Sequence, residues 1–389
     1  MSSLAPLPDL DPASREHAAR VAAHLHRHIA QAGGWVPFEE FMGQALYAPG
    51  LGYYAAGSHK LAAADERAAG GDFVTAPELT PLFAHTLAVA VAHVLRAAGS
   101  SEVLEFGAGT GALAAALLPA LQEQGIEARY RILEVSADLR ERQQRRLAGF
   151  GARVQWLDRL PQAFTGCVLA NEVLDAMPVR LFRWAEDGAV LERGVASTAA
   201  GFAWQDRPAP DDLARTVRER MPPLPGYVSE VNLQAEAFMR QMGQWLAAGA
   251  ALLIDYGFPR HEYYHPQRIA GTLMCHLRHT AHADPLVCAG VQDITAHVDF
   301  TAMADAAFEG GLDVLGYTSQ ARFLLNAGLP AGLQALRESS PGAYARSLNA
   351  VQKLVSEAEM GELFKVLAVG RGLHAPPPGF ERGDRLGTL

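Results

Sequence analysis

A short glycine-rich segment restricts the fold of this chain more than any other feature. Residues 103–106 form an apolar run typical of a buried strand, and an apolar helical pattern begins at Ala112. Between them stand three glycines at alternate positions, Gly107, Gly109 and Gly111. Glycine lets a ligand approach the main chain closely, and the free N–H groups of a helix start face that ligand. The segment therefore predicts an α/β fold with a ligand cradle after one of its strands.

The residue before the glycines helps to identify the ligand. The loop fits the dinucleotide pattern G-x-G-x-x-G/A through Gly107, Gly109 and Ala112. Glu105 argues against a dinucleotide, because its carboxylate would repel a pyrophosphate. S-adenosyl-L-methionine carries no phosphate but has a sulfonium and an ammonium, so a carboxylate beside the loop suits it. The pattern E-x-G-x-G-x-G resembles the first motif of class I methyltransferases. We expect S-adenosyl-L-methionine as cofactor, with a nicotinamide-dependent oxidoreductase as the alternative.

Polar residues follow the next predicted strands. Glu134 lies about 20 residues past the loop, where an acid usually binds ribose hydroxyls. Asp158 follows the third strand, and it either accepts a hydrogen bond from the adenine amino group or is a solvated loop acid. Asn171 and Glu172 follow the fourth strand at the carboxyl edge, where ligands of such sheets bind. Asn171 is expected to contact the cofactor or to shape the strand end.

Composition narrows the classes of partner. The net charge is −9 and no Lys/Arg run stands out, which argues against nucleic acid. The three cysteines, Cys167, Cys275 and Cys288, lack zinc spacing, so we expect no metal. No apolar run reaches membrane-spanning length, and the N-terminus resembles neither a signal nor a transit peptide. With its bacterial-looking composition, the chain is expected to be cytoplasmic.

The order of predicted elements suggests one core domain with additions. We expect an N-terminal helical extension over residues 1–100, packed on a core domain over 101–375. Insertions are expected at about 179–228, where an Asp-Gly pair predicts a hairpin, and at 257–290, a long loop. Residues 376–389 are expected to form a mobile tail. The core contains seven predicted strands, and residues 293–311 are predicted to be helical.

Several segments together resemble the MidA-like methyltransferases, relatives of the mitochondrial complex I assembly factors that methylate arginine. They occur in the family's order and span roughly Trp35 to Gly328. Phe83-Ala84 stands where the family pattern has Phe-Gly, which affects local helix packing more than function. The matching segments are Tyr47–Tyr54, Gly71–Glu78, Leu104–Gly111, Asn171–Pro178, Ile254–Gly257, Gly271–Leu273, Asp293–Phe300 and Gly316–Gln320.

The resemblance implies a fold and an activity. The fold is a Rossmann-like class I methyltransferase, a seven-stranded mostly parallel sheet with helices on both faces, plus the N-terminal helical segment and the hairpin and loop insertions. The activity is S-adenosyl-L-methionine-dependent methylation of a protein with an accessible arginine, giving symmetric dimethylarginine, with a respiratory complex I subunit among the candidate acceptors. The alternatives are a non-catalytic cofactor-binding assembly chaperone and a methyltransferase acting on a small molecule or lipid. The sequence does not predict the oligomeric state.

An arginine acceptor requires acidic residues near the cofactor. Its guanidinium is a poor nucleophile, and two carboxylates can clamp its planar fork. Glu172 is the first choice for this role and Asp175 the second, with a helix N-cap as the structural alternative for Asp175. His297 is a candidate proton acceptor, and the alternative is a hydrogen-bond pair with Asp299 at a helix start.

A second loop is expected to complete the cofactor site. Asp72 and Thr75 belong to the Gly-Asp-Phe-Val-Thr segment. We expect them to close over the methionine part of the cofactor. Asp255, at the end of another core strand, either faces the same pocket or caps the turn after its strand.

Overall fold

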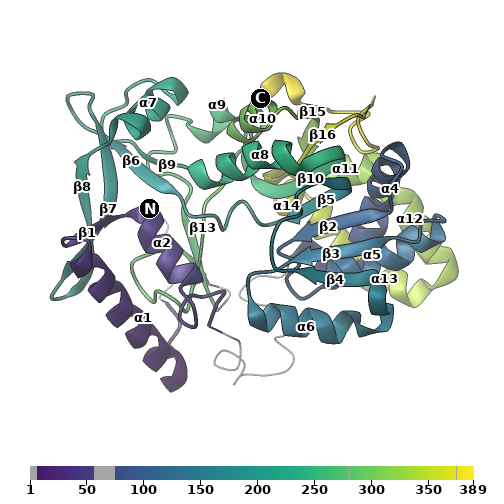
Figure 1. Cartoon of the computed structure of the whole chain (residues 1–389), viewed down its shortest axis with the longest axis horizontal. Helices are drawn as coiled ribbons and strands as arrows, with labels where there is room; N and C mark the ends of the chain where they lie inside the picture. Colours follow the sequence, from purple (N-terminus) through teal and green to yellow (C-terminus); the bar gives the residue numbers. More distant parts are fainter. Residues whose placement is uncertain (1–6, 57–74, 279, 374) are drawn as a thin grey trace. The chain divides into compact units, whose positions relative to one another are not determined.

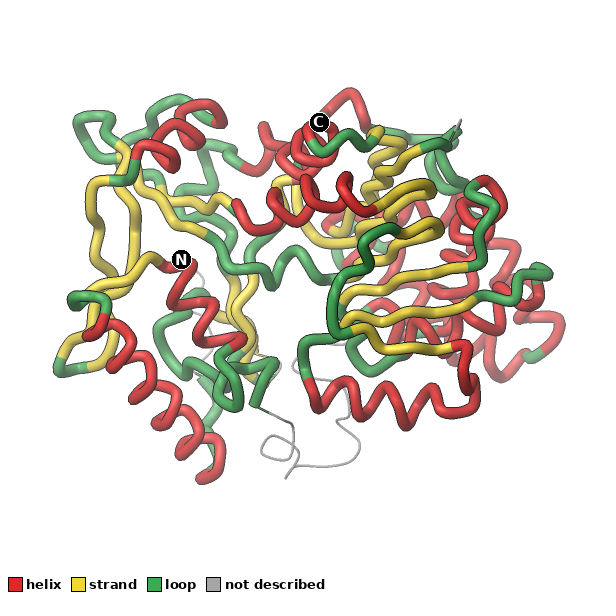
Figure 2. The backbone as a smooth tube through the Cα atoms, viewed as in Figure 1, coloured by secondary structure: helices red, strands yellow, loops and turns green. Residues whose placement is uncertain are grey.

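The computed structural model describes residues 7–56, 75–278, 280–373 and 375–389. The chain forms two compact units, each made of several chain segments (Figures 1 and 2). Unit 1 consists of Met1–Phe73, Asp175–Ala235 and Arg260–His297. Unit 2 consists of Val74–Leu174, Glu236–Pro259 and Val298–Leu389. This division differs from the boundary expected near residue 100, because the helix at 81–97 packs with the core sheet in unit 2.

Unit 2 is built on one eight-stranded sheet. Seven strands follow the order β15-β16-β10-β5-β2-β3-β4, and β14 pairs with β10. Only β16 runs antiparallel to its neighbours, and the other pairs are parallel. The predicted seven-stranded, mostly parallel sheet is confirmed, with β14 as an addition. The strands are β2 (Glu102–Phe106), β3 (Arg129–Leu133), β4 (Val154–Leu157), β5 (Phe164–Asn171), β10 (Leu246–Phe258), β14 (Val298–Asp299), β15 (Asp313–Ser319) and β16 (Phe364–Arg371).

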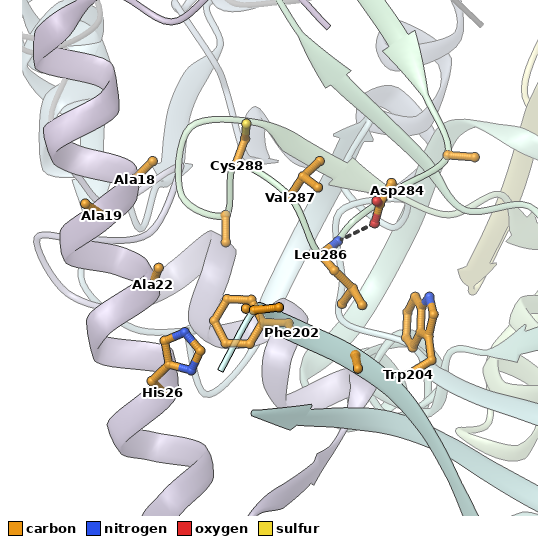
Figure 3. Close-up of a pocket in the computed structure, with 15 residues that line it drawn as sticks. Ala18, Ala19, Ala22, His26, Phe202, Trp204, Asp284, Leu286, Val287 and Cys288 are labelled. Atoms are coloured by element: carbon orange, nitrogen blue, oxygen red, sulfur yellow. Dashed lines mark hydrogen bonds between the residues drawn. The ribbon is translucent and has the colours of Figure 1, made fainter. Parts of the chain in front are cut away.

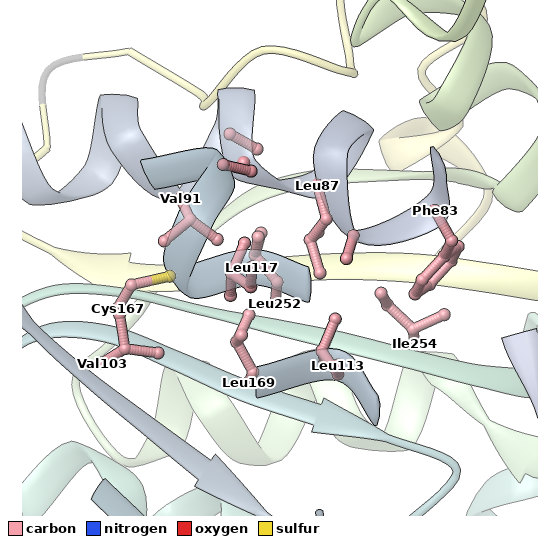
Figure 4. Packing of buried hydrophobic residues seen from close by; sticks show 14 of the residues in the cluster. Phe83, Leu87, Val91, Val103, Leu113, Leu117, Cys167, Leu169, Leu252 and Ile254 are labelled. Atoms are coloured by element: carbon pink, nitrogen blue, oxygen red, sulfur yellow. The ribbon is translucent and has the colours of Figure 1, made fainter. Parts of the chain in front are cut away.

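Helices cover both faces of this sheet, so its central strands are buried on both sides. One face packs against α4 and α5 in the apolar cluster of Figure 4, which includes Val103 of β2. The opposite face of the sheet includes Phe106, whose ring packs edge-on against Phe238 of α8. The helices of unit 2 are α3 (Ala76–Leu79), α4 (Pro81–Ala97), α5 (Ala112–Glu123), α6 (Ala137–Leu147), α8 (Leu233–Trp245), α10 (Phe300–Glu309), α11 (Gln320–Asn326), α12 (Leu329–Ser339), α13 (Pro341–Val355) and α14 (Met360–Leu363), with 3-10 turns η2 (Ala148–Arg153) and η3 (Leu386–Thr388).

Unit 1 contains two antiparallel sheets. The larger has the order β1-β7-β6-β9 with β8 on β7, and the smaller has the order β12-β11-β13. The hairpin predicted around the Asp-Gly pair is β6-β7, whose turn uses Gly188 at φ 79°. The elements are α1 (Pro12–Gln31), β1 (Trp35–Pro37), α2 (Phe38–Tyr47), β6 (Arg180–Trp184), β7 (Val190–Thr198), β8 (Gly201–Pro208), α7 (Asp211–Arg220), β9 (Val228–Val231), α9 (Arg260–Tyr263), β11 (Met274–Leu277), β12 (Thr280–His282) and β13 (Asp293–Thr295).

The core of unit 1 explains why these separate segments fold together. Val21, Leu25 and Ile29 recur every fourth residue on α1 and are fully buried. They belong to a cluster that also contains Val195 of β7 and Ile294 of β13. The hydrophobic face of α1 therefore requires strands that lie far away in the sequence.

Two sequence predictions are corrected by the structure. Residues 293–311, predicted to be helical, contain β13 and β14 before α10 begins at Phe300. The side chain of Asp299 caps α10 by accepting a hydrogen bond from the N–H of Ala302 at 3.1 Å, which supports the structural interpretation of Asp299. The tail, predicted to be mobile, is held by packing. Phe380 is only 3% exposed and contacts Phe323.

Among the described residues, no helix combines the length and the apolar composition that crossing a bilayer requires.

We predict that Phe380→Ala destabilises unit 2 by about 3–5 kcal/mol, because it removes a buried ring from the core. Arg382→Ala, which changes an exposed side chain two residues further on, should alter stability by less than about 0.5 kcal/mol. Urea unfolding followed by circular dichroism measures both. Equal effects of the two substitutions would show that the ring contributes nothing and that the tail is not anchored there.

Candidate cofactor site

The glycine loop joins β2 to α5 in left-handed backbone conformations. Gly107, Gly109 and Gly111 have φ values of 59°, 53° and 82°, which disfavour any side chain. A Cβ added at Gly109 would meet no atom within 4 Å, whereas one at Gly107 would lie 3.1 Å from Cγ2 of Val173. The loop therefore packs tightly against the turn after β5 at Gly107, and it leaves free space at Gly109. This arrangement suits a ligand lying against the main chain.

Glu134 stands at the end of β3, as predicted. One carboxylate oxygen accepts from the N–H of Ser136 at 2.9 Å, and the other accepts from Nε2 of Gln143 at 2.9 Å. The same Nε2 donates to the carbonyl of Gly109 at 2.8 Å, so the carboxylate is connected to the glycine loop. Burial raises the pKa of Glu134, and the two hydrogen bonds oppose that shift. The structure thus brings the predicted ribose acid next to the predicted cradle.

Glu105 lies deeper than the sequence suggested. Side chains along a strand alternate between its two faces, so Glu105 lies on the opposite face of β2 from Phe106. It shares its face with Val103, which belongs to the apolar cluster that packs against α4 and α5. The residue is 3% exposed, and its carboxyl accepts a hydrogen bond from the hydroxyl of Tyr130 at 2.8 Å. Burial raises the pKa of Glu105 to about 8, and the charge of Glu134 adds to the shift. Burial therefore favours the neutral, protonated form of this carboxyl.

The turn after β5 is strained and polar. Glu172 has φ 54°, which is uncommon for a residue with a side chain. Nδ2 of Asn171 donates to Oε1 of Glu172 at 3.0 Å, while Oδ1 of Asn171 is buried and has no hydrogen-bond partner among the described residues. Asp255 accepts from the N–H groups of Val173 and Leu174 at 3.2 and 3.0 Å. Asp255 therefore fixes this turn, and the oxygen of Asn171 is available to a ligand donor.

Three further residues, Asp158, Thr75 and Asp72, are predicted to bind the cofactor. Asp158 is 83% exposed and forms an ion pair with Arg140 at 2.6 Å. Thr75 precedes α3, and its carbonyl accepts from the N–H of Glu78 at 2.9 Å. Asp72 lies outside the described residues.

Two of the predicted catalytic residues belong to unit 1. Asp175 is buried, and its carbonyl accepts from the N–H of Ala296 at 3.0 Å. Residues 176–179 form turns rather than a helix, so the N-cap alternative for Asp175 is wrong. The N–H of His297 donates to the hydroxyl of Thr272 at 3.0 Å. Glu172, the third predicted catalytic residue, lies in unit 2, three residues before Asp175 in the sequence.

Sequence reasoning missed the residues that tie the loop to its neighbours. Glu78 of α3 accepts hydrogen bonds from the hydroxyl of Thr110, in the loop itself, and from Arg146 of α6. Gln143 binds both the loop and Glu134. One signal was present, because Gln143 interrupts an apolar stripe between Leu139 and Leu147 at helical spacing.

A groove of about 650 Å³ lies elsewhere, within unit 1 (Figure 3). Small residues of α1, such as Ala18 and Ala22, line it together with Phe202, Trp204 and Cys288. None of the predicted site residues lies in it.

Within the described ranges, no group of three or more His, Cys, Asp or Glu side chains could hold a metal ion. Cys167 and Cys275 are buried free thiols, and burial raises the pKa values of both thiols.

The chain is similar to known methyltransferases. A family model for S-adenosyl-L-methionine-dependent methyltransferases matches residues 86–318, more than half of the chain. A crystal structure of a protein from Burkholderia thailandensis, bound to S-adenosylhomocysteine, is 50% identical, has a TM-score of 0.92, and covers 99% of this chain and 100% of its own. The mitochondrial protein arginine methyltransferases NDUFAF7 of Danio rerio and Rattus norvegicus are 28% and 27% identical, covering 88% and 92% of this chain and 86% of each relative.

We predict that Gly109→Val weakens binding of S-adenosylhomocysteine by more than about 100-fold, because the new side chain occupies the free space at the loop and opposes its left-handed backbone. Gly125→Val is the matched control. That glycine also has a positive φ and open surroundings, but it follows α5, at the other end of the helix. Calorimetric titration should show affinity near that of the wild type for the control. Equal loss in both variants would attribute the effect to general backbone strain.

The raised pKa of Glu105 predicts a pH-dependent stability. The unfolded carboxyl loses its proton near pH 4.5, whereas the folded one retains it up to about pH 8. Over this window the folded state binds more protons, so stability falls as pH rises, by about 1.4 kcal/mol per unit of pKa difference at most. Glu105→Gln keeps the acceptor for Tyr130 and removes this slope. Thermal unfolding of the ligand-free protein between pH 5 and 8 should therefore show a smaller decline in Tm for the variant. Parallel curves for wild type and variant would contradict the assigned pKa.

Proposed function

Because the chain belongs to the family of S-adenosyl-L-methionine-dependent methyltransferases, we propose that it transfers the methyl group to an arginine side chain of a protein. The cofactor of the family is S-adenosyl-L-methionine, and a related structure holds its product. The names of the mitochondrial relatives support the arginine acceptor, since those proteins match this chain over nearly its whole length. A respiratory complex I subunit is the first acceptor to test, given the resemblance to complex I assembly factors.

The observation that carries the proposal is the conformation of Glu172. A glutamate held at φ 54° is costly, and such strain persists where the surrounding structure enforces it. Asp255 accepts a hydrogen bond from the N–H of Val173, the residue after Glu172. A Cβ added at Gly107 would lie 3.1 Å from Cγ2 of Val173. Glu172 is therefore the chain neighbour of Val173, the residue that packs against the glycine loop. A guanidinium is the acceptor that needs such an acid.

The residues of the cofactor site fit S-adenosyl-L-methionine. The free space at Gly109 admits a ligand to the main chain, and the unpartnered oxygen of Asn171 offers an acceptor to a donor such as an ammonium. Glu134 would hold the ribose hydroxyls with its remaining lone pairs. The cofactor supplies an electrophilic methyl group on a good leaving group, so the protein's task is chiefly orientation.

The acceptor would be handled by acidic residues. Glu172 would bind the guanidinium and bias its electrons toward the attacking nitrogen, and Asp175 would provide the second carboxylate. His297 would receive the proton released after transfer, because an imidazole can accept a proton near neutral pH. Glu105, Asp158, Asp72 and Thr75 remain proposed contributors to cofactor binding.

We predict that Glu172→Gln binds S-adenosylhomocysteine within about threefold of the wild type but loses methyl transfer by about 100-fold or more, because the amide lacks the charge that holds a guanidinium. The assay uses methyl-labelled S-adenosyl-L-methionine and cell extract from a strain of the source organism lacking the gene. Acid hydrolysis then identifies the labelled amino acid as a methylarginine. Glu186→Gln, in the β6-β7 turn, is the control and should transfer normally.

Two results would contradict the proposal in different ways. Label in another amino acid, or in a small molecule or lipid, would keep the enzyme and replace the acceptor. Full complementation of the gene deletion by a Glu172→Gln protein that binds cofactor but transfers nothing would favour the cofactor-binding assembly chaperone.

A further inference from the structure

Gln143 is a fully buried polar residue in the middle of α6. Its amide makes three hydrogen bonds, all with residues of unit 2. Nε2 donates to the carbonyl of Gly109 at 2.8 Å and to Oε2 of Glu134 at 2.9 Å, while Oε1 accepts from Nε1 of Trp156 at 2.9 Å. Every donor and acceptor on this side chain has a partner.

The partners permit only one orientation of the amide. The indole of Trp156 can only donate, so it must face the oxygen of Gln143. The carbonyl of Gly109 and the carboxylate of Glu134 can only accept, so they must face the nitrogen. A side chain of any other type satisfies fewer than three of these groups. In a low-dielectric interior, a completely satisfied network holds its members rigidly.

These contacts connect the ends of three neighbouring parallel strands. Gly109 follows β2, Glu134 follows β3, and Trp156 belongs to β4. Gly111 adds to the connection, because a Cβ there would lie 3.5 Å from Cγ of Gln143. The glycine loop and the acid of the next strand are therefore held to one side chain. The N–H of Ser136 holds the other oxygen of Glu134, which fixes the plane of the carboxylate.

We propose that Gln143 is a positioning residue for the cofactor, which orients Glu134 toward the ribose hydroxyls and holds the glycine loop in its binding conformation. The inference rests on the cofactor site proposed above but not on the identity of the methyl acceptor. Gln143 would thereby contribute to cofactor affinity without itself touching the ligand. The groups facing Gln143 are the carboxylate of Glu134, the carbonyl of Gly109 and the neutral indole of Trp156.

The first test compares Gln143→Met with Gln144→Met by calorimetric titration of S-adenosylhomocysteine. Gln144 is the exposed next residue of the same helix. The change at Gln143 should weaken binding by about tenfold or more, since it leaves two acceptors and one donor without partners, and the control should bind like wild type. A 2′,3′-dideoxy analogue of S-adenosylhomocysteine should lose much less affinity, because it lacks the hydroxyls that Glu134 would bind.

A double-mutant cycle separates positioning from a general structural role. In a Glu134→Ala background, Gln143→Met should cost a clearly smaller factor than it does alone, because its main target has been removed. The same factor in both backgrounds would overturn the proposal. Wild-type affinity in Gln143→Met would overturn it as well. If the wild type itself failed to bind S-adenosylhomocysteine, the cofactor site would fall together with this inference, whereas the arginine acceptor is tested separately by labelling.

Gln143→Glu provides a second readout if the methionine variant folds poorly. Its new carboxyl can donate one hydrogen bond when protonated, but when ionised it faces both the charge of Glu134 and the carbonyl of Gly109. Affinity for S-adenosylhomocysteine should therefore fall as pH rises from 5.5 to 8 relative to wild type, and Gln144→Glu should show no such change. A pH profile identical to that of the wild type would contradict the positioning role.

Discussion

The parallel pairing of β2 with both β3 and β5 is the constraint on which the rest of the site depends. Parallel neighbours end at the same edge of a sheet, so the residues that follow them are brought close without any further design. Gly107 follows β2, Glu134 follows β3 and Glu172 follows β5. The sheet can keep this register because β2 is buried on both faces, where a shift by one residue would place Glu105 among the opposite apolar side chains.

Several groups near this edge cost stability. Glu105 is buried with a pKa of about 8, Glu172 has a left-handed backbone, and the buried oxygen of Asn171 has no partner among the described residues. Each departs from what packing alone would favour, and such departures concentrate at functional sites. The apolar core between α4, α5 and the sheet supplies the compensating stability. Its buried side chains approach the site through Leu113, in the first turn of the helix that follows the glycine loop.

The sequence predicts the sheet well because its signal is local. Phe164–Asn171 is an apolar run with a polar residue at its end, and Leu246–Phe258 contains an apolar run that leads into Asp255. The sequence predicts a helix over 293–311, whereas the structure has β13 and β14 there, because these strands are too short to show a period of two. The sequence predicts a mobile tail because the partner of Phe380 lies more than fifty residues earlier, at Phe323. Composition cannot reveal a contact of that kind.

The same limit explains which site residues were missed. Glycines and acids at strand ends carry a recognisable spacing, but Gln143 obtains its role from Gly109 and Trp156, 34 and 13 residues away. The two units show the limit on a larger scale. The chain leaves unit 2 three residues after β5 and again one residue after β10, so the added segments begin beyond strand ends. Insertions there leave the hydrogen-bonding register of the sheet untouched. Unit 1 can therefore change in sequence while the glycine loop, Glu134 and the buried amide that joins them keep their geometry.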